Sequence, residues 1–157
     1  MAELSGIFSS QGFTEVTTYI QSGNVLFSSE SGSLDQIATQ IESQLVKSMD
    51  NKIPVIVRSV NALETLINQN PFDRYDKDQE VQFYVCFLKD RPQRIPALPL
   101  ISLRDGLEIF QITDLYAFIV SRKVKGRFGF PNNFVEKALD VQATTRNWNT
   151  IIKMISK

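Results

Sequence analysis

The clearest pattern of apolar and polar positions along the chain is helical and covers residues 34–49. Apolar side chains recur there every three or four residues, so they share one face of an amphipathic helix: Leu34, Ile37, Ala38, Ile41, Leu45 and Met49. Ser33 and Gln36 have the spacing of a capping box, which fixes the start of this helix. A shorter helix is predicted over residues 2–11, ending at Gly12.

Alternating or continuous apolar runs predict the strands. The first two, residues 16–21 and 25–28, reverse at Ser22-Gly23-Asn24, because Gly and Asn tolerate a positive φ. The most hydrophobic run, Val81–Leu88, is apolar on both faces, which indicates a central strand in a sheet covered on both sides. Further strands are predicted at Ile53–Ser59 and, as a hairpin, at Leu107–Ile112 and Leu115–Ser121.

Three further helices are predicted from capping residues and apolar spacing. Two of them begin at capping boxes, formed by Asn61 with Glu64 and by Asn133 with Glu136. The last helix is expected to start at Thr144 or Thr145, because the apolar residues that follow fall on one face: Trp148, Ile151, Ile152 and Ile155. This spacing makes Trp148 a core residue rather than a stacking platform for a ligand.

Composition excludes several kinds of chemistry. The 157-residue chain has no histidine, which removes Ser-His-Asp and Cys-His nucleophiles, zinc sites that use histidine, and histidine acid–base catalysis. The one cysteine, Cys86, lies in the predicted central strand and is expected to be a buried small hydrophobe. A single thiol and the lack of a long apolar run favour a cytoplasmic protein that does not enter a membrane.

The net charge is zero, but the charges are unevenly distributed. Residues 1–100 carry 8 basic and 12 acidic side chains, a net charge of −4, whereas residues 101–157 carry 9 basic and 5 acidic ones, a net charge of +4. Such an asymmetry is typical of a binding face, and it also arises as plain surface variation. Both interpretations stay open at this point.

Two stretches of the C-terminal part have the composition of an anion site. Residues 122–130 combine four cations with two glycines and two aromatic residues, and the alternative to an anion site is a solvated turn. The start of the last helix offers unpaired N–H groups beside a cation. The candidate ligand-binding residues in these stretches are Arg122, Lys123, Lys125, Arg127, Thr145, Arg146, Asn147 and Asn149, and polar groups of the first hairpin add Gln21, Ser22 and Asn24.

The acidic residues of the segment 72–80 do not form a metal site by their pattern. Asp73, Asp76 and Asp78 lack the spacing of an EF-hand loop and its glycine, and Arg74 and Lys77 intervene. We therefore expect a solvated loop here. The sequence predicts no metal, no cofactor and no catalytic residue.

Several stretches together resemble a known family. They are TYIQSGNVLF, PVIVRS, NPF, GRFGFPNNFVEKAL and, near the C-terminus, ATTRNWNT. They look like the domain-of-unknown-function 1697 family of bacterial proteins, and the resemblance extends over essentially the whole chain. It implies an α+β fold with two ferredoxin-like halves of βαββαβ type, residues 1–70 and 71–157, whose antiparallel sheets are packed by helices. It implies no established activity.

At the N-terminus the chain differs from the family that it resembles. Members of the family usually begin with an extra strand and a glycine-rich loop before the helix that here starts at Met1. Without that strand the first hairpin has an uncovered edge, and such edges pair readily with another chain. Three explanations stay open: the chain is a truncated copy, its numbering begins after a segment not shown, or a strand of another chain fills the gap. If the 157 residues are the whole polypeptide, we expect dimerisation or exchange of an element with a second copy.

Three kinds of function remain compatible with the sequence. The first is a non-catalytic binding or accessory protein that recognises an anion, namely a nucleotide, a nucleic acid or an acidic partner. The second is an enzyme whose acid or base is a carboxylate, a lysine, a tyrosine or the cysteine. The third is a structural or interaction module in which the recognised motifs only determine the fold. The abundance of amides and hydroxyls in these motifs favours binding over proton transfer.

Overall fold

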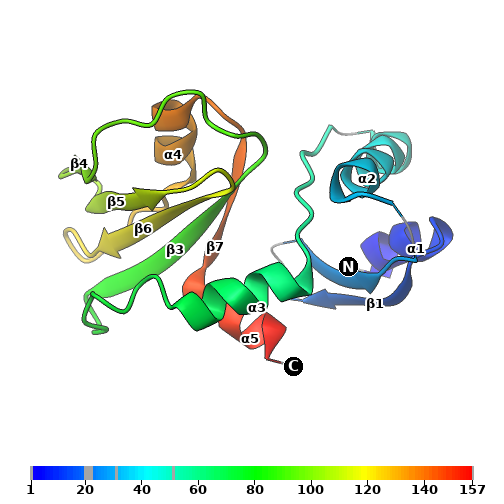
Figure 1. Cartoon of the computed structure of the whole chain (residues 1–157), viewed down its shortest axis with the longest axis horizontal. Coiled ribbons are helices and arrows are strands. Elements are labelled where there is room, and N and C mark those ends of the chain that lie inside the picture. The colour runs from blue at the N-terminus through cyan, green and yellow to red at the C-terminus, as the bar shows by residue number, and fades with distance from the viewer. Residues whose placement is uncertain (1, 20–22, 31, 51, 157) are drawn as a thin grey trace. The chain divides into compact units, whose positions relative to one another are not determined.

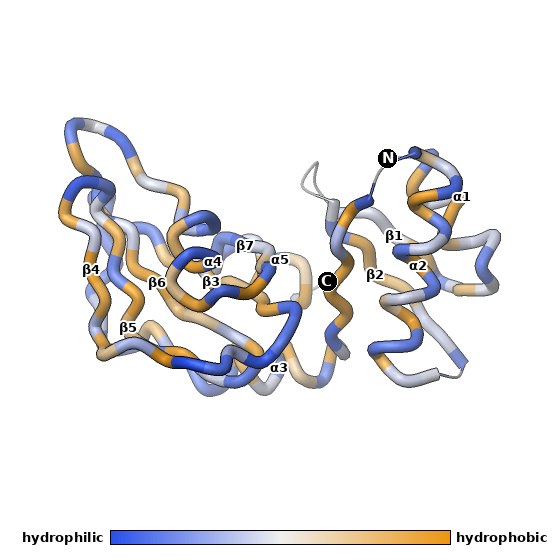
Figure 2. The backbone as a smooth tube through the Cα atoms, turned by 90° about the horizontal axis from the view of Figure 1, so that it is seen from above, coloured by the Kyte–Doolittle hydropathy of each residue, from blue (hydrophilic) through white to orange (hydrophobic). Residues whose placement is uncertain are grey.

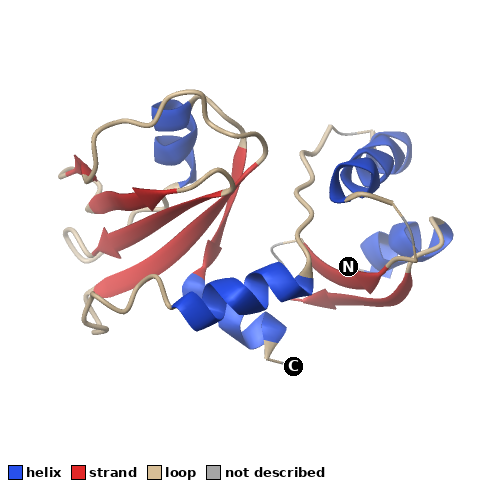
Figure 3. Ribbon diagram, viewed as in Figure 1, coloured by secondary structure: helices blue, strands red, loops and turns tan. Residues whose placement is uncertain are grey.

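The computed structural model describes residues 2–19, 23–30, 32–50 and 52–156. The residue contacts divide the chain into two compact units, Met1–Ser59 and Val60–Lys157. The first residues of the second unit form helix α3 (Val60–Gln69), which the predicted boundary at residue 70 had placed in the first half. Each unit combines helices with an antiparallel sheet, so the predicted α+β class is confirmed (Figure 3).

The first unit packs two helices on a two-stranded sheet. Its elements are α1 (Ala2–Ser10), β1 (Thr14–Tyr19), β2 (Asn24–Ser28) and α2 (Leu34–Met49) (Figure 1). Strands β1 and β2 pair antiparallel, as the hairpin prediction requires. Phe8, Phe13 and Phe27 meet in the core, where the closest ring centroids, those of Phe13 and Phe27, are 4.6 Å apart.

Helix α2 follows the sequence prediction closely. The Ser33 hydroxyl accepts a hydrogen bond from the Gln36 N–H at 3.2 Å, and the Ser33 N–H donates to the Gln36 side chain at 3.1 Å, so the capping box is confirmed. Ile37, Ile41 and Leu45 are buried in the core of the unit. Hydrophobic and hydrophilic positions are interspersed along α2 (Figure 2).

The strand predicted at Ile53–Ser59 is wrong, because residues 52–59 form no strand. Val55 and Val57 pack against the core of the first unit, as strand residues of this composition would. The Val55 N–H donates instead to the Glu42 side chain at 2.9 Å. A carboxylate on α2 therefore satisfies a backbone donor that a neighbouring strand would otherwise have used.

The second unit is built on a five-stranded antiparallel sheet with the strand order β4-β5-β6-β3-β7. Its strands are β3 (Val81–Leu88), β4 (Leu100–Ser102), β5 (Leu107–Ile112), β6 (Tyr116–Arg122) and β7 (Ala143–Asn147). The prediction for Val81–Leu88 is confirmed to the residue, and this strand pairs with β6 on one side and β7 on the other. The short strand β4 was not predicted.

The predicted ferredoxin-like topology is not confirmed. A ferredoxin-like unit has a helix in both of its crossovers. Here helix α4 (Asn132–Leu139) lies in the crossover from β6 to β7, but the crossover from β3 to β5 holds the short strand β4 and no helix. In the described part of the first unit, two strands are present.

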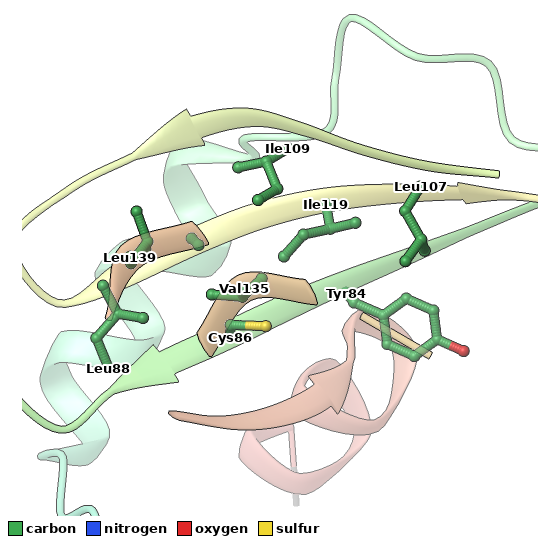
Figure 4. Close-up of a cluster of buried hydrophobic side chains, with 9 residues drawn as sticks. Tyr84, Cys86, Leu88, Leu107, Ile109, Ile119, Val135 and Leu139 are labelled. Carbon is green, nitrogen blue, oxygen red and sulfur yellow. The ribbon is translucent and has the colours of Figure 1, made fainter. Parts of the chain in front are cut away.

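The two faces of the five-stranded sheet have different cores. On one face Val135 and Leu139 of α4 pack on Cys86, Ile109 and Ile119, as Figure 4 shows. On the other face Phe72 is the centre of an aromatic cluster, with ring centroids between 4.7 and 6.0 Å from those of Phe83, Phe110, Phe118 and Trp148. Trp148 is 5% exposed, so its prediction as a core residue is confirmed.

The final helix, α5 (Trp148–Ile155), starts later than predicted. Thr144 and Thr145 belong to strand β7, and Asn147 is the residue that caps the helix. The predicted capping box of Asn133 and Glu136 is also wrong, since α4 begins at Asn132 behind Pro131. The Glu136 carboxylate accepts a hydrogen bond from the Ala143 N–H at 2.8 Å, and so it holds the start of β7.

Candidate functional site

The basic segment, residues 122–130, contains a tight two-residue turn just after β6. Val124 and Arg127 exchange two backbone hydrogen bonds of 2.8 and 3.0 Å. Lys125 and Gly126, between them, have φ angles of 51° and 78°, the pair of positive values that a type I′ turn requires. Glycine adopts such an angle without strain, which explains Gly126, whereas Lys125 is one of the non-glycine residues with a positive φ. We call residues Val124–Arg127 the basic turn.

The two cations that precede this turn are matched by carboxylates. Arg122 forms an ion pair with Glu108 at 2.7 Å, and Tyr75 donates its hydroxyl proton to the same carboxylate at 3.0 Å. The pKa of Tyr75 is raised, mainly because the phenol is partly buried and secondly because of this hydrogen bond. Lys123 lies 3.9 Å from Glu80 and above the ring of Phe128. These pairs neutralise about half of the positive charge that the sequence concentrates here.

Lys125 and Arg127 are different. Both side chains are exposed, and neither forms an ion pair with another residue of the described ranges. Their charges are therefore available to a ligand. Of the four candidate cations in the basic segment, the structure thus leaves two that lack a carboxylate partner among the described residues.

Two glycines hold the base of the basic turn in place. A Cβ on Gly129 would lie 2.5 Å from the Asp105 carbonyl oxygen, and a Cβ on Gly106 would overlap the Arg122 carbonyl oxygen. The Ser121 hydroxyl also donates to the Gly129 carbonyl at 2.9 Å. These close approaches need residues without a side chain, so the backbone on both sides of the basic turn is fixed by packing.

Thr145 is placed in the interior rather than at a helix start. Its hydroxyl is 2.8 Å from the Cys86 sulfur and donates to the Asn132 side chain, also at 2.8 Å, while the residue is 4% exposed. The premise of an anion site at a helix beginning at Thr145 is therefore wrong. The hydrogen bonds link β7, β3 and α4, which gives the threonine a role in the fold.

The other polar residues of the ATTRNWNT stretch hold the junction of β7 and α5. Arg146 donates to the Thr144 hydroxyl and to the Thr145 carbonyl, each at 2.9 Å, and burial lowers its pKa. The Asn147 side chain accepts a hydrogen bond from the Asn149 N–H at 2.9 Å, and the Asn149 side chain accepts one from Lys77 at 3.2 Å.

The candidates of the first hairpin belong to the first unit. Asn24 is 8% exposed, and its side-chain amide donates to the Tyr19 carbonyl at 3.3 Å, across the turn. This bond stabilises the hairpin. Gln21 and Ser22 lie outside the described residues.

The described ranges contain neither a candidate metal site nor a candidate membrane-spanning helix. No group of three or more Asp, Glu or Cys side chains in them could hold a metal ion, and no helix in them is long and apolar enough to cross a membrane. In the acidic segment 72–80, the Asp78 carboxylate accepts a hydrogen bond from the Glu80 N–H at 2.7 Å. This side chain is therefore used to shape the loop.

Cys86 is buried, and burial raises the pKa of its thiol from the ordinary value of 9.0 to about 12. The unfolded chain loses this proton above pH 9 while the folded protein keeps it, so the thiol favours folding below pH 9 and this contribution is lost as the pH rises from 9 towards 12. We expect the free energy of unfolding, measured by urea denaturation, to fall between about pH 8 and about pH 10. This fall should be roughly 1 kcal/mol smaller in Cys86→Ala than in the wild type. Equal losses in both proteins would contradict the burial of the thiol.

Sequence reasoning missed one exposed residue next to the basic turn. The Phe130 side chain is 61% exposed, and its ring meets that of Tyr84 edge-on, with centroids 5.7 Å apart. The signal was present in the sequence as GRFGFP, in which Phe130 stands between a glycine and a proline. Which of the two phenylalanines points outward follows only from the structure.

The comparisons with known proteins agree with the family resemblance. A family model described as "Protein of unknown function (DUF1697)" matches residues 1–118. No curated protein and no solved structure gave a significant match. The matched residues include the first hairpin and most of the five-stranded sheet, and they end before the basic turn. The chain belongs to the DUF1697 family, whose function is unknown.

Proposed function

We propose that this protein is a non-catalytic binding protein that recognises an anionic ligand through Lys125 and Arg127. The observation that supports this most directly is that both cations are exposed and lack an ion pair within the described ranges. Cations held on a fixed turn attract phosphate or carboxylate groups at little conformational cost. Arg122 and Lys123 contribute at longer range, reduced by Glu108 and Glu80.

The buried thiol supports a binding role over catalysis. Cys86 lies in the sheet interior with a raised pKa, so it is a poor nucleophile, and the chain has no histidine. Nucleotides, nucleic acids and acidic partners are the ligand classes that this proposal covers. A cytoplasmic location and a homodimer are part of the same proposal.

The test is a fluorescence titration of the protein at low salt with nucleotides, oligonucleotides and an acidic peptide. We expect the double variant Lys125→Ala/Arg127→Ala to bind anions about 5- to 30-fold more weakly, because each lost charge contact contributes about 0.5–1 kcal/mol at an exposed site. The variant Arg94→Ala/Lys153→Ala is the matched control. It also removes one arginine and one lysine charge, but from exposed positions elsewhere in the second unit.

Three outcomes are informative. Weakening by the turn variant alone supports the proposal. Equal weakening by both variants means that only the net charge matters, which contradicts a site at the basic turn. Absence of binding by the wild-type protein to every anion contradicts the proposed function as a whole.

A further inference from the structure

The exposed ring of Phe130 lies three residues after Arg127 and is large for a solvent-exposed side chain. Its edge-on contact with Tyr84 has an interplanar angle of 85°. In this geometry Tyr84 supports one side of the Phe130 ring and itself stays 8% exposed. The Phe130 ring therefore stands on a buried aromatic residue and presents its remaining surface to solvent.

The backbone around Phe130 is fixed on both sides. Gly129 is in close contact with the Asp105 backbone and accepts a hydrogen bond from Ser121 at 2.9 Å, while Pro131 is fully buried. Phe130 is consequently not free to fold its ring into the core. A rigidly displayed aromatic ring loses little conformational entropy when a ligand stacks on it.

Three exposed residues within the segment 125–130 combine two chemical features. Lys125 and Arg127 supply charges for phosphates, and Phe130 supplies an aromatic face for a base. Proteins that bind single strands use this combination, because the bases of a single strand are free to stack on side chains whereas those of a duplex are stacked on one another.

Arg127 and Phe130 are three positions apart in the sequence, so their Cα atoms lie within about 10 Å of each other. Both side chains are therefore within reach of one short strand, which offers a phosphate and an unstacked base together.

We propose that the basic turn and Phe130 together bind single-stranded nucleic acid, with phosphates at Lys125 and Arg127 and a base stacked on Phe130. This inference rests on the proposed anion-binding function and narrows its ligand to one class. It gives the exposed phenylalanine a role that the anion site alone does not require.

The experiment measures binding of three probes by fluorescence anisotropy or competition: a single-stranded oligo-dT, a duplex of the same length, and inorganic tripolyphosphate. We expect Phe130→Ala to weaken oligo-dT binding about 5- to 150-fold, the range for loss of one stacked base, and to leave tripolyphosphate and duplex binding unchanged. Phe130→Trp should retain oligo-dT binding. Leu103→Ala, at a side chain that is 87% exposed, is the control for loss of exposed apolar surface.

The outcomes separate this inference from the proposed function. If Phe130→Ala binds oligo-dT as the wild type does while Lys125→Ala/Arg127→Ala weakens all three probes, the stacking role is overturned and the anion site stands. If poly-glutamate, an acidic peptide tested as a fourth probe, binds more tightly than oligo-dT, the ligand class is wrong. If no probe binds, both proposals fail. A melting temperature of Phe130→Ala equal to that of the wild type shows that lost binding is not lost folding.

Discussion

Replacing Phe72 by alanine is expected to lower the free energy of unfolding of the second unit by about 3–5 kcal/mol, the usual cost of deleting a buried phenylalanine side chain. Phe72 is 3% exposed, stacks on Phe83 with ring centroids 4.7 Å apart, and packs against the tilted ring of Trp148 at 5.1 Å. A cavity at this point would open the contact between the loop after α3, the sheet and α5. Because small domains are stable by only about 5–15 kcal/mol, much of the stability would be lost.

Phe130→Ala is the matched control, as it makes the same substitution at a side chain that is 61% exposed. We expect it to change the free energy of unfolding by no more than about 0.5–1 kcal/mol. Urea denaturation followed by tryptophan fluorescence measures both, since Trp148 lies in the affected cluster. Similar losses at the two positions would contradict the assignment of Phe72 to the core and Phe130 to the surface.

Replacing Gly106 by alanine is the second change with a large expected effect. Gly106 has a φ of 70°, and its Cβ would overlap the Arg122 carbonyl oxygen and approach the Val124 side chain to 2.8 Å. We expect a loss of about 1–2 kcal/mol for the left-handed backbone and about 1–3 kcal/mol more for the overlap. The Arg122 N–H donates to the Gly106 carbonyl at 2.8 Å, and this hydrogen bond would be distorted when the Arg122 backbone moves away from the new Cβ.

Gly126→Ala separates the two contributions. Gly126 has a φ of 78°, similar to that of Gly106, but in the described part of the chain no atom beyond its two neighbouring residues lies within 4 Å of the position of its Cβ. It should therefore lose only the conformational part, about 1–2 kcal/mol. Thermal denaturation that shows equal destabilisation by both alanines would mean that the backbone does not approach Gly106 as closely as described.

The elements that sequence predicts well are those whose burial is written into a local pattern. Val81–Leu88 is apolar at every position but one, and only a central strand buries both of its faces. Helix α2 carries both a complete apolar face and a capping box, so its start and its orientation follow from a few neighbouring residues. In both cases local preference and tertiary packing favour the same structure.

The elements that sequence predicts poorly depend on partners far along the chain. Thr145 was expected at a helix start, because the apolar period of α5 is strong and threonine is a common cap. Its actual partners are Cys86, 59 residues away, and Asn132. Similarly, Glu136 has the spacing of a capping residue but bonds the Ala143 N–H. Local spacing contains no information on such contacts.

The candidate site could be predicted in part. The sequence identified the basic segment at residues 122–130, but it could not rank the four cations, since ranking depends on which carboxylates lie nearby. Glu108 and Glu80 pair with Arg122 and Lys123 across neighbouring strands and loops. The exposure of Phe130 also depends on the close backbone contact at Gly129, which no local pattern indicates.

The most direct test of the anion site is the salt dependence of oligo-dT binding by the wild type and by Lys125→Ala/Arg127→Ala. For single strands, the slope of log Kobs against log salt concentration is about −0.7 for each phosphate contact. If the two cations each contact a phosphate, the slope of the double variant should be less steep by about 1.4. An unchanged slope, with an affinity equal to that of the wild type, would contradict the binding of anions by the basic turn.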